Sequence, residues 1–225
     1  MKAHARGRTA AARSINRADD ATRDRLLKVA ERLFADRGFR KVTIREVCRA
    51  AHANVAAVNY HFGDKLGLYR EVLQAAIDVM RATTDAARSA GVGQPAEEQL
   101  RRWIAIFNQR LLGSGHDSVH KLIHHEMHDP TPAFDALVEQ GVRPRVEYLS
   151  MLVAEILRCP VSDPRVLRCV ASVHAQSLAY VPNPIASRLG FPFTPTSARL
   201  DEVAEHIAEF SLGGIHAVGR AVHAR

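Results

Sequence analysis

Two short helices with their own caps follow one another near the start of the chain, and this pattern constrains the fold more than any other. Thr43 with Glu46 three residues later has the spacing of a capping box, in which each residue bonds the backbone N–H of the other. The helix that it opens ends near Ala50. Asn54 is then a suitable N-cap for a second helix to about Phe62. The spacing predicts a helix, a tight turn and another helix.

Amphipathic helices flank this pair. The preceding helix begins at Thr22 and should end at Gly38 with a left-handed cap. One face of it carries apolar residues at helical spacing: Leu26, Leu27, Ala30, Leu33 and Phe34. After Asp64 a longer helix follows, with its own apolar side: Leu68, Tyr69, Val72, Leu73, Ala76, Ile77 and Met80. The first three helices therefore have a helix-turn-helix layout.

The remaining chain also predicts helices and almost no strand. The expected helices cover residues 96–112, 118–128, 133–158, 165–181 and 198–221. Pro144 should kink or split the long one, because proline removes a backbone hydrogen bond. Breaks are expected at residues 113–115 and in a proline-rich stretch from Pro182 to Pro195. We expect an all-α protein of about nine helices.

Charge is distributed unevenly along the chain. Residues 1–70 hold 16 Lys and Arg against 7 Asp and Glu, a net charge of +9, and the remaining residues hold 15 against 17, a net charge of −2. This asymmetry favours a polyanionic partner for the first third of the chain, although a basic, solvated tail would look the same. Residues 1–20 lack a hydrophobic period and predict a flexible basic arm with five cations: Lys2, Arg6, Arg8, Arg13 and Arg17.

Three domains follow from these patterns. They are the arm at 1–20, a helix-turn-helix DNA-binding domain at 21–66, and a larger helical domain at 67–225. No apolar run approaches the ~18 residues of a membrane span, and no apolar segment follows the basic N-terminus as in a secretory signal. Three widely spaced cysteines, without a CxxC pair, favour reduced thiols in a cytoplasm: Cys48, Cys159 and Cys169.

The second capped helix has the composition of a reader of the DNA major groove. It is slim near its start, and it carries amide and phenol groups that can bond bases and phosphates. The helix before it begins with Thr43 and Arg45, where backbone N–H groups and a guanidinium can hold a phosphate. Lys65 follows the two short helices and is a further candidate phosphate contact. The candidate DNA contacts are Thr43, Arg45, Asn54, Ala57, Asn59, Tyr60, His61 and Lys65. A three-helix bundle with ordinary polar surface residues is the alternative.

Residues 22–73 resemble the TetR family of transcriptional repressors. The resemblance rests on AERLFADRGFRKVTIREV and on NYHFGDKLGLYREVL, in which Tyr-x-Phe, a lysine and Leu-Tyr are the specific part. His52 departs from the pattern, because the family commonly has glycine there, and its turn should be slightly strained. Residues 121–190 resemble the CecR branch, through Asp129-Pro130-Thr131-Pro132 and Ser172-Val173-His174-Ala175-Gln176. That branch implies a regulator of transport or drug-sensitivity genes.

The resemblance implies that residues 67–225 bind a small effector and dimerise. The last two helices, about 165–181 and 198–221, would form the dimer surface, where Gly213 and Gly214 allow close approach of a partner helix. An intramolecular core face is the alternative explanation. The candidate effector-site residues are Trp103, Phe107, His124, Tyr148, Met151, His174 and Tyr180. Most large apolar residues in this domain would simply form its core.

Three histidines at spacing i, i+4 and i+8 raise the question of a metal. His120, His124 and His128 point the same way along a helix, with Glu126 and Asp129 nearby, and two such histidines can share zinc or nickel. A polar helix face explains the spacing equally well. We assign no metal and no cofactor to the chain, and keep a metal-responsive regulator as the alternative function.

The sequence favours a regulator over an enzyme. It contains no Gly-rich phosphate loop, no nucleophile elbow and no HExxH motif, which argues against a metal-dependent hydrolase. A DNA-organising protein without an effector is a further class, which the large near-neutral second domain disfavours. The expected function is a homodimeric repressor that a small molecule releases from a palindromic operator.

Overall fold

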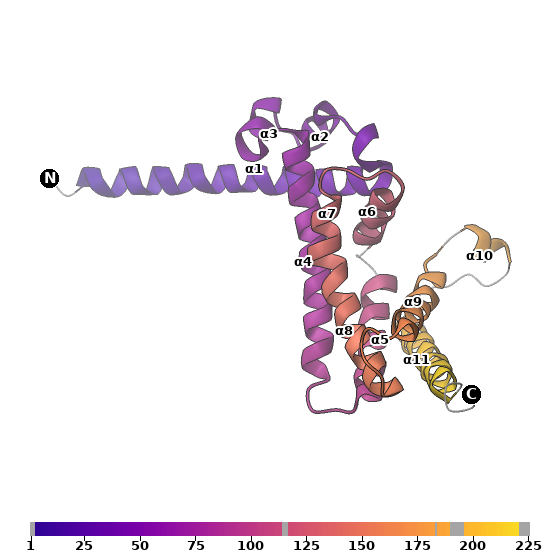
Figure 1. Ribbon diagram of the computed structural model, residues 1–225. Helices are drawn as coiled ribbons and strands as arrows, with labels where there is room; N and C mark the ends of the chain where they lie inside the picture. The colour runs from indigo at the N-terminus through magenta and orange to yellow at the C-terminus, as the bar shows by residue number, and fades with distance from the viewer. Residues whose placement is uncertain (1–2, 114–116, 183, 190–195, 221–225) are drawn as a thin grey trace. The chain divides into compact units, whose positions relative to one another are not determined.

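The computed structural model describes residues 3–113, 117–182, 184–189 and 196–220, and it confirms the all-α class (Figure 1). Its described residues form eleven α-helices and one π-helix. In the first half these are α1 (Ala3–Lys41), α2 (Ile44–Ala50), α3 (Val55–Phe62), α4 (Lys65–Ala90), α5 (Ala96–Leu112) and α6 (Asp117–His128). In the second half they are α7 (Phe134–Ala136), η1 (Leu137–Val142), α8 (Arg143–Leu157), α9 (Pro164–Ala179), α10 (Pro184–Arg188) and α11 (Ser197–Arg220).

The chain divides into two compact units. The N-terminal unit contains Met1–Ala76 together with Lys121–Phe134, and the C-terminal unit contains Ile77–His120 and Asp135–Arg225. This division differs from the sequence-based boundary at 66/67 in two ways, since the first three turns of α4 and most of α6 belong to the N-terminal unit.

Helix α1 buries residues of the apolar face that the sequence predicts, and α2 and α3 pack against it. Leu26, Ala30 and Phe34 of α1 are fully buried, as are Val47 of α2 and Val58 of α3. Three aromatic rings close this core, with Phe34 edge-on to Tyr69 at 4.9 Å and Phe39 4.8 Å from Tyr69. The amphipathic pattern of the flanking helices thus supports the short helix pair between them.

The structure corrects the prediction that the N-terminal residues form a flexible arm. Helix α1 begins at Ala3, so residues 3–20 are helical rather than an arm without structure. Ala and Arg are strong helix formers, and a helix already nucleated beyond residue 20 can extend without a new nucleation cost. The side chains of the five basic residues expected there, from Lys2 to Arg17, lie outside the part of the chain whose side chains the structure describes.

Helix α1 breaks at Gly38 as predicted, but helical residues resume and run to Lys41, and the break is not the left-handed cap that the sequence predicts. The Gly38 φ of 76° is positive and its ψ of 163° is not helical, so the chain turns sharply there without the αL geometry of a standard cap. A Cβ on this residue would lie 3.0 Å from Nδ1 of His125. Both the backbone angle and the packing therefore require glycine here.

The C-terminal unit is a helical bundle built around α5, α8, α9 and α11. Its core is one continuous apolar cluster, in which Trp103, Leu149, Val166 and Ile207 are all fully buried. Helix α11 packs against α5, α8 and α9, so the last helix is integral to this core. The end of α4 joins the same cluster through Ala87.

Pro144 splits the long helix predicted for residues 133–158. The preceding turn widens into the π-helix η1, where the N–H of Arg143 donates to the carbonyl of Val138, five residues back. Widening by one residue accommodates the proline, which lacks an N–H and crowds the carbonyl four residues before it. Gly141 in this turn lies where a Cβ would be 3.1 Å from the sulfur of Met80.

The remaining chain breaks are only partly described. The break expected at residues 113–115 and the stretch from Pro182 to Pro195 extend into residues outside the described part, while α10 is an additional short helix within that stretch. None of the described helices is long and apolar enough to cross a membrane.

Candidate functional site

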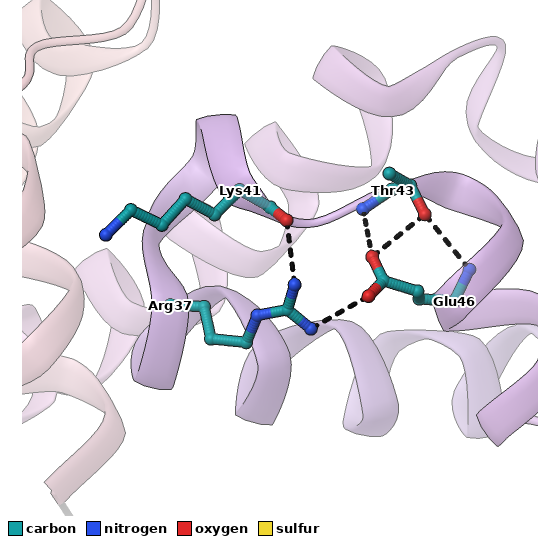
Figure 2. Close-up of polar contacts among 4 residues, drawn as sticks. All are labelled: Arg37, Lys41, Thr43 and Glu46. Carbon is teal, nitrogen blue, oxygen red and sulfur yellow. Dashed lines mark hydrogen bonds and ion pairs between the residues drawn. The ribbon is translucent and has the colours of Figure 1, made fainter.

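The start of α2 is held by a fully formed capping box (Figure 2). The Thr43 N–H donates to Glu46 at 2.8 Å, and the Glu46 N–H donates to the Thr43 hydroxyl at 3.3 Å. Arg37 donates to the same carboxylate at 2.9 Å and to the carbonyl of Lys41, also at 2.9 Å. The Thr43 backbone hydrogen bond, followed by that from Arg37, lowers the pKa of Glu46 to about 2. The end of α1 is thus tied to the beginning of α2.

Helix α3 presents a narrow exposed face. The Asn54 side chain accepts the N–H of Ala57 at 2.8 Å, which confirms its role as N-cap. Val58 and Phe62 are buried and anchor the helix, while Val55, Ala56, Asn59 and Tyr60 are exposed. Tyr60 is 76% exposed, so its ring and hydroxyl are accessible to a partner. The face combines one amide, one phenol and small apolar groups.

His61 does not belong to this face, which corrects the sequence-based assignment. Its side chain is only 8% exposed, and its Nε2 lies 3.2 Å from Oδ1 of Asp19. Residue 61 stands three positions after buried Val58, so it shares the inward side of the helix. Val55 and Ala56, which the candidate DNA contacts did not include, lie exposed in its place, and the i, i+4 spacing to Asn59 and Tyr60 would have indicated them.

The cations near the short helices differ in their surroundings. Arg45, in the first turn of α2, is exposed. Lys65, the first residue of α4, is partly buried, with its Nζ 4.3 Å from the centre of the Phe39 ring. Burial lowers the pKa of Lys65, and the cation–π contact holds its ammonium near the end of α3. Their roles as phosphate contacts remain predictions.

The turn between α2 and α3 has the strain expected from its sequence. His52 has a φ of 50°, in the left-handed region that glycine adopts without cost. The turn is held by the N–H of Ala53, which donates to the carbonyl of Cys48 at 2.9 Å. The turn therefore keeps its geometry at the expense of an unfavourable histidine backbone conformation.

Helix α6 is fastened to the N-terminal unit through a buried carboxyl group. Glu126 is 1% exposed and accepts hydrogen bonds from the Tyr69 hydroxyl at 2.7 Å and from the Thr131 N–H at 3.1 Å. Burial raises the pKa of Tyr69 far above its ordinary value, and the hydrogen bond to Glu126 is the next largest cause. The phenol therefore stays protonated and acts as the donor. At the periphery, Lys121 pairs with Asp36 at 3.1 Å.

The histidine series on α6 does not form a metal site in the described residues. His124 is exposed and its ring stacks on that of His128 at 4.3 Å, while His128 Nδ1 bonds the carbonyl of His124 at 2.8 Å. No group of three or more His, Cys, Asp or Glu residues is placed to hold a metal ion in the part of the chain that is described. His125 instead packs inward, with Nε2 3.1 Å from the carbonyl of Ala35.

Three of the candidate effector-site residues come together in the C-terminal unit. The Trp103 and Phe107 rings stack at 4.7 Å, and His174 lies edge-on to them at 5.1 and 5.4 Å. Tyr148 is buried in the same core and donates to the side chain of Gln99 at 3.2 Å. Tyr180 packs against this core and is partly buried.

Two other candidate effector-site residues, Met151 and His124, lie outside this core, so their assignment was wrong. Met151 is 54% exposed, although the sequence pattern suggested an inward position. His124 is exposed on α6, which belongs to the N-terminal unit. In both cases helical spacing alone did not reveal which side of the helix would meet the core.

Polar residues that sequence reasoning missed join the aromatic cluster. The Arg145 guanidinium lies 5.3 Å above the Phe107 ring, and Asn108 donates to the Ser177 hydroxyl at 3.2 Å. Burial, followed by the charge of Arg145, lowers the pKa of His174 to about 3. Arg145 precedes buried Tyr148 and Leu149 by three and four positions, and this spacing was a signal that it faces inward.

Known families match both parts of the chain. The model of the bacterial regulatory proteins of the tetR family matches residues 26–72, and that of the C-terminal domain of the HTH-type transcriptional dual regulator CecR matches residues 96–215. CecR of Shigella flexneri is 28% identical over 170 residues, which cover 72% of this chain and 76% of CecR.

Solved structures show the same fold. A TetR-like transcriptional regulator from Rhodococcus sp. RHA1 superposes with a TM-score of 0.64 at 18% identity, over 87% of this chain and 96% of the other. AibR, solved in complex with isovaleryl coenzyme A and operator DNA, superposes with a TM-score of 0.60 at 18% identity, over 85% and 96%. The protein thus belongs to the TetR family of transcriptional regulators, with a DNA-binding helix-turn-helix at α2 and α3 and a C-terminal domain of the CecR type.

Proposed function

We propose that this protein is a homodimeric repressor that binds a palindromic operator and leaves it when a small molecule binds the C-terminal unit. The observation that carries the proposal is the exposed face of α3 with Asn59 and Tyr60, on a helix fixed at its start by Asn54. An exposed amide can bond adenine, and an exposed phenol can bond phosphate. Arg45 and Lys65 then serve as phosphate contacts on either side.

Dimerisation is supported by apolar residues left exposed on the last two long helices. On α11, Phe210 is 67% exposed and is followed at i+3 and i+4 by Gly213 and Gly214, where an added Cβ would meet no other atom within 4 Å. On α9, Leu167 and Leu178 stand three helical turns apart and are both exposed. An exposed apolar stripe of this kind can pack against the same stripe of a second copy of the chain. A two-fold dimer would place one reading helix at each half-site of a palindromic operator.

A small-molecule effector is supported by the polar groups inside the C-terminal unit and by the kind of complex solved for AibR. Neither alternative function has comparable support. The relatives are transcriptional regulators, and the described histidines form no metal-binding group.

The test is to titrate labelled DNA from upstream of the protein's own gene with the protein. Binding is measured by fluorescence anisotropy at several salt concentrations. Tyr60→Ala should weaken binding by about tenfold, because one exposed contact is lost. Val92→Ala is the matched control, since Val92 is also 76% exposed but lies outside the helix-turn-helix. Lys65→Gln should reduce the slope of log affinity against log salt by about 1. Equal affinities for Tyr60→Ala and wild type would contradict the assigned face.

The dimer is tested separately by light scattering. Phe210→Glu should convert the dimer to a monomer, because it places a charge in the centre of the apolar stripe. Met151→Glu is the control, since Met151 is similarly exposed on a different helix. A dimer that survives Phe210→Glu would contradict the proposed surface.

A further inference from the structure

An unusual set of buried polar atoms occupies the core of the C-terminal unit. Four of them have no hydrogen-bond partner among the described residues: Trp103 Nε1, Asn108 Oδ1, Arg145 Nε and His174 Nε2. They come from α5, α8 and α9. The Trp103, Phe107 and His174 rings contact one another, and Arg145 lies over the Phe107 ring. Asn108 follows Phe107 in α5 and bonds Ser177 of α9. Buried polar groups in native proteins are nearly always paired, so these atoms call for a partner that water or a bound ligand supplies.

The charge in this cluster is not balanced. Arg145 has a buried Nε, and no described carboxylate forms an ion pair with it. Its guanidinium instead lies over the face of the Phe107 ring. A partly buried charge without an ion-pair partner is costly, and burial lowers the pKa of Arg145 to about 10. The arginine therefore remains charged at neutral pH, and no acidic side chain of the described residues pairs with it.

The other groups of the cluster are neutral. His174, with a pKa near 3, carries no charge at neutral pH, while Trp103 contributes an N–H donor and Asn108 a carbonyl acceptor. Arg145 and His174 are both only partly buried as residues, so the cluster is not sealed from the surface. One positive charge thus faces apolar rings and a few hydrogen-bonding groups.

We propose that the effector is a small monocarboxylate with an apolar body, whose carboxylate pairs with Arg145 while the apolar part packs against Trp103 and Phe107. A guanidinium binds a carboxylate through two parallel hydrogen bonds, and this pairing removes the cost of the unpaired charge. The neutral amide of the same body cannot supply the missing charge. The proposal rests on the proposed function in that it names the ligand of the effector site.

The single tryptophan of the chain makes a direct test possible without DNA. Trp103 is the only tryptophan, so the intrinsic fluorescence of the full-length protein reports on this cluster. Benzoate and hexanoate are titrated in the millimolar range expected for such small ligands, each beside its neutral amide, benzamide or hexanamide. Both carboxylates should change the Trp103 emission with saturation and raise the melting temperature, and the amides should do neither.

Variants of Arg145 separate recognition from structure. Arg145→Met should weaken carboxylate binding by at least about tenfold, whereas Arg145→Lys should retain part of it. Without ligand, Arg145→Met should melt at or above the temperature of wild type, because the variant removes a partly buried charge that has no ion-pair partner among the described residues. Arg143→Met is the control, since Arg143 is exposed on the same helix and pairs with Glu139.

Two results would overturn the proposal. The first is that neither carboxylate gives a saturable change in the Trp103 emission of the wild-type protein. The second is that the emission changes equally with carboxylates and amides, or that wild type and Arg145→Met bind the carboxylates equally well. Failure of the proposed function would look different, because it would appear as absent DNA binding by wild-type protein whatever the fluorescence titration shows.

Discussion

The buried hydrogen bond between Tyr69 and Glu126 makes a quantitative prediction. Tyr69→Phe removes only the hydroxyl, and the ring keeps its edge-on contact with Phe34. Glu126, which is 1% exposed, would retain one donor, the Thr131 N–H, and water could not replace the other. Leaving a buried acceptor partly unsatisfied costs about 1–3 kcal/mol, so we expect a loss of about 2 kcal/mol in the free energy of unfolding.

Two other tyrosines of the chain, Tyr148 and Tyr60, provide matched controls for the same chemical change. Tyr148→Phe removes a hydrogen bond to Gln99, which is partly exposed and can bond water, so the loss should stay below about 1 kcal/mol. Tyr60→Phe alters an exposed side chain and should change stability by less than about 0.5 kcal/mol.

Urea denaturation followed by circular dichroism measures all three variants. The Tyr69→Phe loss corresponds to a fall of roughly 4–8 °C in melting temperature for a chain of this size. The reasoning would be refuted if Tyr69→Phe cost no more than Tyr60→Phe, because the Glu126 carboxyl would then not depend on the phenol. An equal cost for Tyr69→Phe and Tyr148→Phe would show that burial of the acceptor is not the deciding factor.

Three further predictions concern single residues. His52→Gly should stabilise the protein by up to about 1 kcal/mol in urea melts, because relief of the positive φ exceeds the added chain entropy of glycine; a loss of stability would contradict the strain. Gly38→Ala should cost about 1–3 kcal/mol by the same method, since its φ is 76° and its Cβ would meet His125 at 3.0 Å; a neutral effect would contradict both reasons. His174 binds its proton more weakly in the folded protein, with a pKa of about 3 against the ordinary 6.5, so the unfolded chain gains a proton first as pH falls. Its contribution to stability is therefore complete above pH 6.5 and falls between about 6.5 and 3, by up to ~1.4 kcal/mol per pH unit. His174→Gln should remove this part of the slope in urea melts compared across pH, and identical slopes would refute the assignment.

The features that sequence predicted best depend on neighbours within a few residues. The capping box of Thr43 and Glu46, the Asn54 cap and the split before Pro144 all appear as expected. Each follows from hydrogen bonds or steric contacts within one or two helical turns. The positive φ of His52 belongs to the same class, because a tight turn imposes it whatever surrounds the turn.

The features that sequence missed depend on which side of a helix meets the core. Spacing did not distinguish the inward side of α3, where His61 lies, from the outward side with Tyr60. It also placed Met151 inward and overlooked Arg145, although the two lie on the same helix. A period of 3.6 residues defines faces, but contacts with other helices decide which face is buried.

By itself, the sequence determined the bounds of the two short helices α2 and α3, the helix-turn-helix layout and the concentration of positive charge in the first third of the chain. These properties are local or additive along the chain. Only the tertiary structure showed that α6 joins the N-terminal unit and that an arginine without an acidic partner among the described residues lies beside aromatic rings in the other unit. Such facts depend on pairs far apart in sequence, such as Tyr69 and Glu126, which are separated by 57 residues and meet only when the chain is folded.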